Sequence, residues 1–320
     1  MLIVQKYGGS SLRDPERLRA VAERCRRRRG EAELVVVVSA MGGATDRLTG
    51  RARELSAEPS ARELDALVTT GEQQAAALLV MAMETLGLPA VSLTGWQAGI
   101  LTDTHHGDGD IRLIAPRRVR AELSRGRVPV VTGFQGLCAA GDITSLGRGG
   151  SDTTAVALAA ALEADACEIY TDVDGIYTAD PRVLPQARLL AAIDTRDMLA
   201  LARAGSRVLH AKSVELALAN AVPLRLLSSF DEGPGSEVKL LPDAARPRIA
   251  GVTGRPETGR ITLAGRGADA AALSEAALLL AGAGIAVQDA ALGEGAFTLL
   301  VAPADWQPAL ALLHDGLIAE

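Results

Sequence analysis

Residues 2–39 read LIVQKYGGSSLRDPERLRAVAERCRRRRGEAELVVVVS. In this stretch two short apolar runs flank one helical pattern, and this order indicates the fold class. The runs Leu2–Lys6 and Leu34–Ser39 are rich in Val, Ile and Leu and predict strands. The second is continuously apolar from Leu34 to Val38, as expected for a strand that is covered on both faces. Residues 14–29 between the runs predict a helix.

The same alternation continues along the chain. Further strands are expected at Ala90–Thr94, Val128–Gly133, Cys167–Thr171 and Leu224–Leu227. Further helices are expected near residues 62–86, 117–125, 152–164, 194–203 and 212–220. This order predicts an α/β fold with a mainly parallel sheet and helices on both sides.

A change in composition marks the last part of the chain. Residues 231–247 contain Gly233, Pro234, Gly235, Pro242 and Pro247 and predict a linker. Residues 248–320 then predict strand, strand, helix, strand, strand, helix. This order is typical of a small α+β module.

Composition and charge exclude several classes of function. Of 320 residues, 48% are hydrophobic and 22% are charged, which is typical of a soluble globular protein, and the net charge of −6 argues against a nucleic-acid partner. No segment reaches the ~18 apolar residues of a membrane span, and MLIVQKYGGSS lacks the features of a signal peptide. Cys25, Cys138 and Cys167 have no metal-ligand spacing, so we expect free thiols in a reducing cytoplasm.

The first motif with chemical potential is KYGGSS, residues 6–11. Gly8 and Gly9 have no Cβ, so their backbone N–H groups can approach phosphate oxygens closely. Lys6 is one of only three lysines in an arginine-rich chain, which indicates a need for a compact ammonium there. Lys6 would then neutralise charge on a phosphoryl group. The alternative is an ordinary strand-to-helix turn.

The second motif is SLGRGGSDTTAVALAAALEA, which begins at Ser145 and joins a Gly-rich loop to an Ala-rich helix. Ser151 or Asp152 can cap this helix, and the helix N-terminus favours an anion. Capping alone does not explain Arg148 among three glycines, because a guanidinium grips a carboxylate through two hydrogen bonds. We therefore expect an anion-binding loop here.

The third motif is EIYTDVDGIYTADPR, residues 168–182, in which a strand ends at Asp172 and Asp174. Loops at the carboxyl ends of parallel strands line the ligand crevice. The two carboxylates could bind Mg²⁺, contact a nucleotide or form a turn, and the pattern does not choose among these roles.

Weaker signals come from three other segments. VSAMGGATDRL, residues 38–48, predicts a strand and then a loop of Gly and Thr, and TTGEQQAAALL, residues 69–79, puts Glu72 at the start of a helix. A group of acidic and histidine side chains lies in a polar loop and lacks helical metal-ligand spacing, so we expect a loop and no metal site. Its members are Asp103, His105, His106, Asp108 and Asp110.

Taken together, these motifs resemble the aspartokinases of the amino-acid kinase superfamily. The resemblance runs over residues 1–241 in the family's own order, and it is carried by KYGGSS, SAMGGATD, TTGE, TGWQAG, GFQG, LGRGGSDTTAVALAAAL and EIYTDVDGIYTADPR. It implies a three-layer αβα catalytic domain over residues 1–241. It also implies phosphorylation of the side-chain carboxylate of L-aspartate by ATP with Mg²⁺, a first step toward lysine, threonine and methionine.

The resemblance also implies roles for individual residues. Lys6 and Asp152 would organise phosphoryl transfer, and Gly8, Gly9 and Ser10 would hold the phosphates. Thr45, Glu72, Arg148, Gly150 and Ser151 would hold aspartate. Thr171, Asp172, Asp174, Tyr177 and Arg182 would line the nucleotide site. Arg207 stands before Val208–Leu209–His210 where the family often has Lys, and Lys212 lies five residues further on.

Two other readings stay open. One is a related kinase for another acidic metabolite, such as an N-blocked glutamate or a modified aspartate. Glu72 discriminates here, because a free ammonium needs an acidic partner and an acylated amine does not. The other is a non-catalytic regulatory subunit, which predicts the loss of Lys6, Asp152 or the glycine loops.

For residues 248–320 the resemblance implies an ACT-like module for regulation and dimerisation, with room for one such module after Pro247. The module lacks the Pro-Gly pair that commonly opens the first helix, since Ala270 and Ala271 stand there. It also reads GIAVQD from Gly284, where an Asn often follows the Ile. We therefore expect a homodimer that lysine and threonine inhibit weakly or not at all, with a divergent effector site as the alternative.

Overall fold

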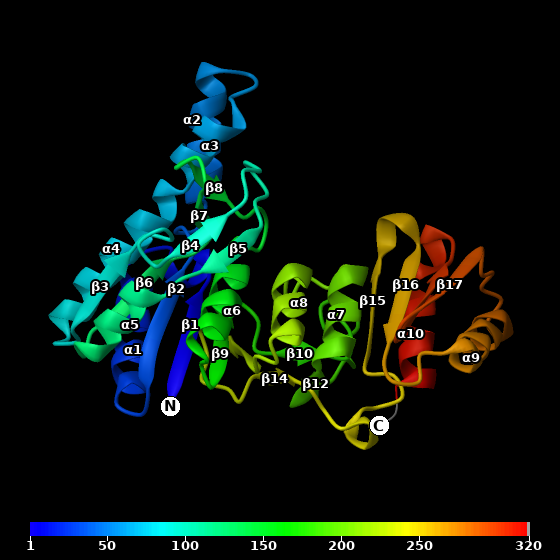
Figure 1. Ribbon diagram of the computed structural model, residues 1–320. Helices are drawn as coiled ribbons and strands as arrows, with labels where there is room; N and C mark the ends of the chain where they lie inside the picture. Colours follow the sequence, from blue (N-terminus) through cyan, green and yellow to red (C-terminus); the bar gives the residue numbers. More distant parts are fainter. Residues whose placement is uncertain (319–320) are drawn as a thin grey trace. The chain divides into compact units, whose positions relative to one another are not determined.

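The computed structural model describes residues 1–318 and divides them into two compact units (Figure 1). The first unit comprises Met1–Asp174 and Val222–Gly233, and the second comprises Gly175–Ala221 and the residues from Pro234 onward. The expected division into a catalytic part, residues 1–241, and a regulatory part, residues 248–320, is a division by function and stays a prediction.

Six parallel strands form the sheet of the first unit, in the order β13, β9, β1, β2, β6, β3. These strands are β1 (Leu2–Tyr7), β2 (Glu33–Val38), β3 (Ala90–Leu93), β6 (Val128–Thr132), β9 (Ala166–Thr171) and β13 (Leu224–Ser228). Each of them lies within one residue of its predicted position, which confirms the expected parallel sheet. Continuous apolar runs form such strands because both faces are covered.

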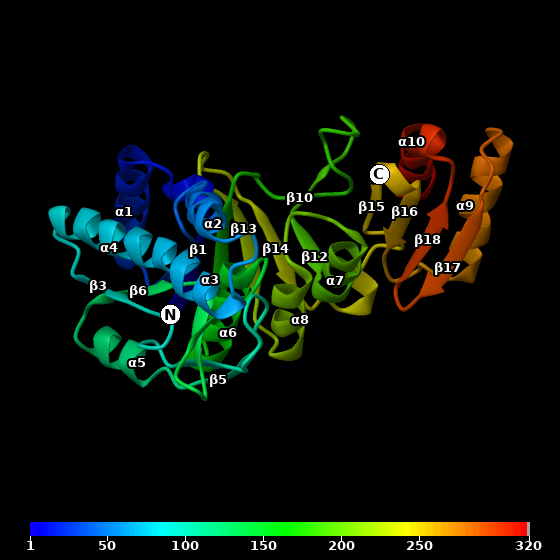
Figure 2. The same cartoon turned by 90° about the horizontal axis from the view of Figure 1, so that it is seen from above.

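Helices cover both faces of this sheet (Figure 2). They are α1 (Pro15–Arg29) and α4 (Thr70–Thr85), which pack against each other on one face, and α5 (Arg117–Ser124) and α6 (Gly150–Leu162), which pack on the other. The α/β prediction is therefore confirmed. Because helices cover both faces, a ligand is expected at the carboxyl ends of the strands, where ligands bind in such folds.

The alternation of side chains along β1 decides which face each one meets. Ile3 and Tyr7 pack in the core cluster that contains Leu18 and Val21 of α1. The side chain of Lys6 points to the opposite face, because successive side chains of a strand alternate. Lys6 therefore faces α6, and this placement matters for the site below.

Parts of the first unit differ from the sequence prediction. The structure has a second sheet of short strands, β5 (Ile111–Ile114), β4 (Ile100–Thr102), β7 (Gln135–Cys138) and β8 (Ile143–Ser145), in that order. Its strands hold only three or four residues, too few for a clear period. In the segment of residues 38–48, where a loop is expected after the strand, the helix α2 (Ala44–Leu55) already begins at Ala44.

The helix predicted near residues 62–86 is two helices, α3 (Ala61–Val68) and α4. Thr69 lies at the junction, where its hydroxyl donates a hydrogen bond to the carbonyl of Asp65 at 2.7 Å. Such a bond from a Thr side chain to the preceding turn competes with the regular helical pattern. Glu72 consequently lies in the first turn of a new helix.

The second unit begins with a hairpin of β10 (Ile176–Tyr177) and β11 (Leu189–Leu190). It continues with the parallel strands β12 (Ala192–Asp194) and β14 (Ser236–Lys239) and the helices α7 (Thr195–Ala204) and α8 (Ala211–Ala219). The prediction of a linker over residues 231–247 is wrong at β14. Ser236 and Val238 alternate there as buried side chains, so the segment forms a strand.

The rest of the second unit is a four-stranded antiparallel sheet with two helices. The sheet order is β15 (Gly251–Arg255), β16 (Arg260–Ala264), β18 (Ala296–Leu300), β17 (Asp289–Gly293), and the helices are α9 (Ala270–Gly282) and α10 (Trp306–Leu317). The predicted order of strand, strand, helix, strand, strand, helix is confirmed.

Two expectations from composition can be compared with the described residues. Cys25, Cys138 and Cys167 are free, as expected, and all three are buried. Across residues 1–318 the structure contains no helix with both the length and the apolar character that crossing a membrane requires.

Candidate active site

Lys6 and Asp152 form an ion pair at the carboxyl edge of the main sheet. The Lys6 Nζ lies 2.6 Å from the Asp152 Oδ1, and the two side chains are only 11% and 14% exposed. Lys6 is next to last in β1, and Asp152 lies in the first turn of α6. The structure thus brings together the two residues for which the resemblance implies roles in phosphoryl transfer.

The first glycine loop packs tightly against the loop that follows β2. A Cβ on Gly9 would lie 2.8 Å from the Ala40 carbonyl oxygen, and the backbone N–H of Gly42 donates to the Gly9 carbonyl at 3.0 Å. The backbone N–H of Gly8 donates to the Tyr170 carbonyl at 3.4 Å. Glycine is therefore required at position 9 by close approach of backbone, and the exposed Ser10 follows it.

The second glycine loop delivers the N-terminus of α6. Gly149 caps this helix with a φ of 75° and without a side-chain hydrogen bond. The expectation that Ser151 or Asp152 caps the helix is therefore wrong, because both lie inside its first turn. The backbone N–H of Gly150 donates to the Gly147 carbonyl at 3.1 Å. The N–H groups of Ser151 and Asp152 in the same first turn have no acceptor within the helix, so they can bind an anion.

Ser151 is buried in that turn against Gly133 of the GFQG segment. A Cβ on Gly133 would lie 2.7 Å from the Ser151 Cβ, so glycine is needed there. Gly150 is likewise enclosed, since its Cβ would lie 2.9 Å from that of Leu146. Arg148, in contrast, is exposed and forms no ion pair with any of residues 1–318. Its guanidinium is available for a ligand.

Glu72 is a buried carboxylate in which one oxygen accepts a hydrogen bond and the other accepts none from the described residues. It is 3% exposed, and its Oε1 accepts a hydrogen bond from the Ala40 N–H at 2.9 Å. Its Oε2 has no hydrogen-bond partner within the described residues. Burial raises the pKa of Glu72 to about 7. An unpaired buried carboxylate oxygen is costly unless a ligand completes it.

Three of the sequence motifs meet around Ala40. Gly9 and Glu72 both contact its backbone, and a Cβ on Gly71 would lie 2.9 Å from the Ala40 Cβ. Thr45, half-buried in the first turn of α2, follows Gly43, which has a φ of 72°. Three motifs that are separate in the sequence therefore pack against one another here, namely KYGGSS, SAMGGATD and TTGE.

The predicted nucleotide residues fall in two groups. Thr171 ends β9, and its hydroxyl donates to Asp172 at 3.1 Å; Asp172 and Asp174 are exposed. The second unit contains the remaining members of the predicted set, which are Tyr177 on β10, Arg182 and Arg207.

Arg182 binds the Asp180 carboxylate in a fork, with N–O distances of 2.9 and 2.8 Å. The hydrogen bond from Arg182 holds the pKa of Asp180 below its usual value, and the charge of Arg207 adds to this effect. Both arginines therefore lie near one carboxylate. Lys212 is half-buried in the first turn of α8.

Sequence reasoning missed Asp65, which ties the second glycine loop to α3. Its carboxylate accepts hydrogen bonds from the Ser145 hydroxyl at 2.6 Å, the Ser145 N–H at 3.0 Å and the Gly107 N–H at 3.0 Å, and His106 Nδ1 lies 3.0 Å away. A single Asp in ARELDALV carries no signal of this role, because all its partners are distant in sequence.

The polar loop of residues 103–110 is held by such contacts. Asp103 accepts hydrogen bonds from the N–H groups of His105 and Asp110 and pairs with Arg112 at 3.0 Å. Among residues 1–318 no three His, Cys, Asp or Glu side chains are grouped as a metal ion would require. The expectation of a loop describes these residues well.

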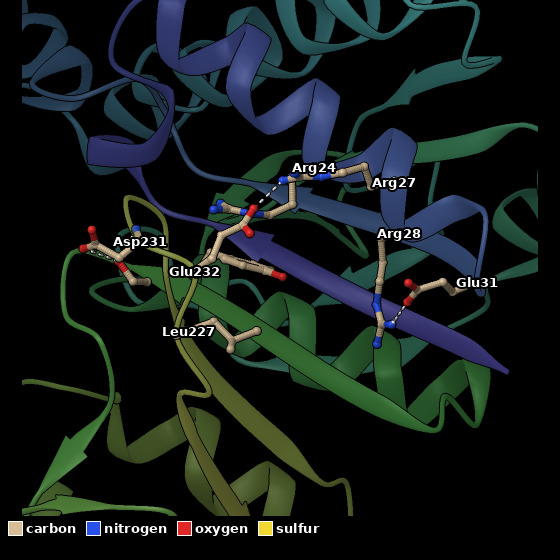
Figure 3. Close-up of a pocket in the computed structure, with 10 residues that line it drawn as sticks. Arg24, Arg27, Arg28, Glu31, Leu227, Asp231 and Glu232 are labelled. Atoms are coloured by element: carbon tan, nitrogen blue, oxygen red, sulfur yellow. Dashed lines mark hydrogen bonds and ion pairs between the residues drawn. The ribbon is translucent and has the colours of Figure 1, made fainter.

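A cavity of about 330 Å³ lies between α1 and the end of β13 (Figure 3), and Tyr170 of the third motif forms part of its lining. Its arginines already have partners in the protein. Arg24 lies over the Tyr170 ring at 4.8 Å, Arg27 pairs with Glu232 at 2.7 Å, and Arg28 pairs with Glu31 at 2.5 Å. These arginines differ from Arg148, so we assign the cavity no role.

The fold and the glycine loops agree with comparison to known proteins. Residues 1–228 match the model of the amino acid kinase family, and the chain therefore belongs to this family. It is 51% identical over 267 residues to the aspartate kinase of Pseudomonas putida, covering 82% of this chain and 65% of that one. It is 53% identical over 237 residues to the aspartokinase of Corynebacterium glutamicum, covering 73% of this chain and 56% of that one.

Solved structures give the same result. The aspartate kinase from Synechocystis is 33% identical with a TM-score of 0.69, covering 99% of this chain and 69% of that chain. Escherichia coli aspartokinase III in complex with aspartate and ADP is similar in fold, with 20% identity, a TM-score of 0.85 and full coverage of both chains. The chain spans 65% of the length of the Pseudomonas putida relative.

Proposed function

We propose that the protein is an aspartate kinase, which transfers the γ-phosphoryl group of ATP to the side-chain carboxylate of L-aspartate and forms 4-phospho-L-aspartate. The observation that carries the proposal is the Lys6–Asp152 ion pair between two glycine loops. The similarity to aspartate kinases at about half identity supports the same reaction.

The chemistry fits the residues. A free aspartate side chain has a pKa near ~3.9, so it is already an anion at neutral pH and needs no general base. The difficulty is to bring this anion to an anionic triphosphate, which requires cations and backbone N–H groups. Lys6 supplies a cation, and the first turn of α6 supplies donors. Mg²⁺ bound with ATP would neutralise charge on the phosphates, as is general for kinases.

Two side chains would select the amino acid. The unpaired Arg148 would grip one substrate carboxylate through its fork of donors. Glu72 would pair with the substrate ammonium, because its Oε2 is buried and has no partner within residues 1–318. Thr45, Gly150 and Ser151 would complete this site.

The same features weigh against the alternatives. A kinase for an N-blocked glutamate would have no ammonium to pair with Glu72. A non-catalytic subunit would have no need for Lys6 and Asp152 to be paired.

The nucleotide is proposed to contact Gly8, Gly9 and Ser10 through its phosphates. The other proposed contacts, taken over from the family motifs, are Thr171, Asp172, Asp174, Tyr177, Arg182 and Arg207. The three buried free thiols are compatible with the proposed cytoplasmic location.

A coupled assay of ADP release tests the reaction. Aspartate, glutamate and their N-acyl forms are compared at equal concentration with ATP and Mg²⁺. The proposal predicts turnover with aspartate that exceeds the others by at least about 100-fold, the scale set by leaving buried polar groups unpaired. Comparable turnover with an N-acyl acid, or none with aspartate, would overturn it.

We further propose that the C-terminal sheet is an ACT-like module that joins two copies of the chain. The edge strand β17 supports this, because all five of its residues are exposed and it lies at the end of the sheet order. An exposed edge strand is a template for pairing with another chain. Sedimentation of the wild type and of Leu292→Lys tests the proposal. A dimer that dissociates in the variant is expected, and a monomeric wild type would refute it.

A further inference from the structure

Thr178 connects the β10–β11 hairpin, residues 176–190, to the C-terminal sheet and to α10. Its N–H donates to the Arg188 carbonyl at 2.9 Å, and its carbonyl accepts from the Val252 N–H of β15 at 2.8 Å. Its hydroxyl accepts from the Arg188 N–H at 3.0 Å and lies 2.9 Å from His314 Nε2 of α10. One 2% exposed residue thus makes four hydrogen bonds to three elements.

The direction of the hydroxyl bond follows from the other side of the ring. His314 Nδ1 lies 3.1 Å from the Asp315 carboxylate, which only accepts hydrogen bonds when ionised. In the neutral ring Nδ1 therefore carries the proton, and Nε2 accepts from the Thr178 O–H. The chain of donors runs from Arg188 through Thr178 to His314.

Apolar packing reinforces this connection. Ala179 and Leu184 of the hairpin are buried in the core of the C-terminal sheet, together with Val252 of β15 and Leu313 of α10. The hairpin is therefore built onto this core. Between its strands it presents Asp180 and Arg182, which are exposed.

We propose that Thr178 and His314 are positioning residues, which hold the hairpin in the shape that binds ATP. The proposal rests on the proposed function, because that function places Tyr177 and Arg182 on the nucleotide. The hydrogen bond between Thr178 and α10 then sets the affinity for ATP and leaves the affinity for aspartate unchanged.

Thr178→Val is the direct test, because it keeps the shape of the side chain and removes the hydroxyl. It leaves the Arg188 N–H and the His314 Nε2 without their partner, so the hairpin is expected to shift. Thr178→Ser keeps the hydroxyl and should restore wild-type behaviour. Thr262→Val is a matched control, because Thr262 is 6% exposed and its hydroxyl binds that of Thr298 at 2.8 Å in the same sheet.

The expected result is a rise of about fivefold in the KM and the Kd for ATP in Thr178→Val, the effect of losing about one hydrogen bond. The KM for aspartate should stay within about twofold, since a uniform loss of folding would change both. Thr178→Ser and Thr262→Val should resemble the wild type.

Hydrogen exchange gives a second measurement that does not depend on activity. The peptide that contains the Arg188 amide should exchange faster in Thr178→Val than in Thr262→Val. Equal changes in the two KM values, the same pattern in Thr262→Val, or unchanged exchange would overturn the proposal. A wild type that binds no ATP in direct titration would instead refute the proposed function, and the exchange comparison would still decide whether Thr178 holds the hairpin.

Discussion

Replacing Glu72 with Gln tests two effects of the buried carboxylate, its cost in protein stability and its contribution to binding aspartate. Gln keeps an oxygen that can accept the hydrogen bond from the Ala40 N–H, which lies 2.9 Å from Glu72 Oε1. It removes the negative charge and places an amide nitrogen where the unpaired Oε2 now lies. The variant should therefore fold, and it should bind aspartate poorly because the substrate ammonium loses its partner.

The burial of Glu72 gives the stability of the protein a pH dependence of defined sign. Burial raises the pKa of Glu72 from 4.5 to about 7. Between these values the folded protein binds more protons than the unfolded chain, so this group lowers stability as the pH rises through the window. Above pH 7 the full cost is about 3 kcal/mol, and roughly 2 kcal/mol of it develops between pH ~5.5 and pH ~8.

Urea unfolding of the wild type and Glu72→Gln at the two pH values measures this effect. The stability of the wild type relative to the variant should fall by about 2 kcal/mol on going from pH ~5.5 to pH ~8. The difference between two pH values is the quantity to use, because the buried amide of Gln adds a constant penalty.

Substrate binding gives the functional half of the test. Aspartate needs ionised Glu72, so its Kd in the wild type should rise by up to tenfold for each pH unit below 7. In Glu72→Gln the Kd should be at least about 100-fold weaker at pH 8 and nearly independent of pH, as expected when a buried ammonium loses its charge partner. The reasoning fails if the variant binds aspartate as the wild type does, or if both show the same pH dependence.

Three further predictions follow from the site. Lys6→Ala should lower kcat by at least about 100-fold while the fold is kept, and Lys6→Arg should also be poor because the fork is bulkier than an ammonium; near-normal turnover in folded Lys6→Ala would contradict this role. Arg148→Ala should raise the KM for aspartate much more than that for ATP, and equal rises would place Arg148 on the nucleotide. Titration with lysine, threonine and methionine, singly and in pairs, should give weak or no inhibition, whereas strong inhibition below about 1 mM would show a working effector site of backbone groups.

The main sheet could be predicted because each of its strands has a sequence pattern that lies within one short segment. The continuous apolar run Leu34–Val38 specifies a strand covered on both faces, and it needs no knowledge of its neighbours. The short strands of the second sheet could not be found in this way. Ile100–Thr102 has three residues, and its pairing with residues 111–114 and 135–138 depends on tertiary contacts.

Some residues of the candidate site can likewise be predicted from the sequence, and others cannot. Lys6 and Gly9 lie in a motif that can be read directly, and the structure shows what the glycine does against Ala40. The role of Asp65 could not be predicted, because its partners at positions 106, 107 and 145 come from other segments. The cap of α6 is also hidden from sequence analysis, because Gly149 caps the helix through a positive φ and not through a side chain.

Trapping the product with hydroxylamine shows directly whether the protein phosphorylates aspartate, because hydroxylamine converts an acyl phosphate into a stable hydroxamate. Wild-type protein is incubated with ATP, Mg²⁺ and aspartate, and hydroxamate is measured together with ADP, with folded Lys6→Ala as the control. We expect one hydroxamate on the side chain of aspartate for each ADP released, and about 100-fold less of both in the variant. Release of ADP without hydroxamate, or equal yields from aspartate and its N-acyl form, would contradict phosphorylation of aspartate by this site.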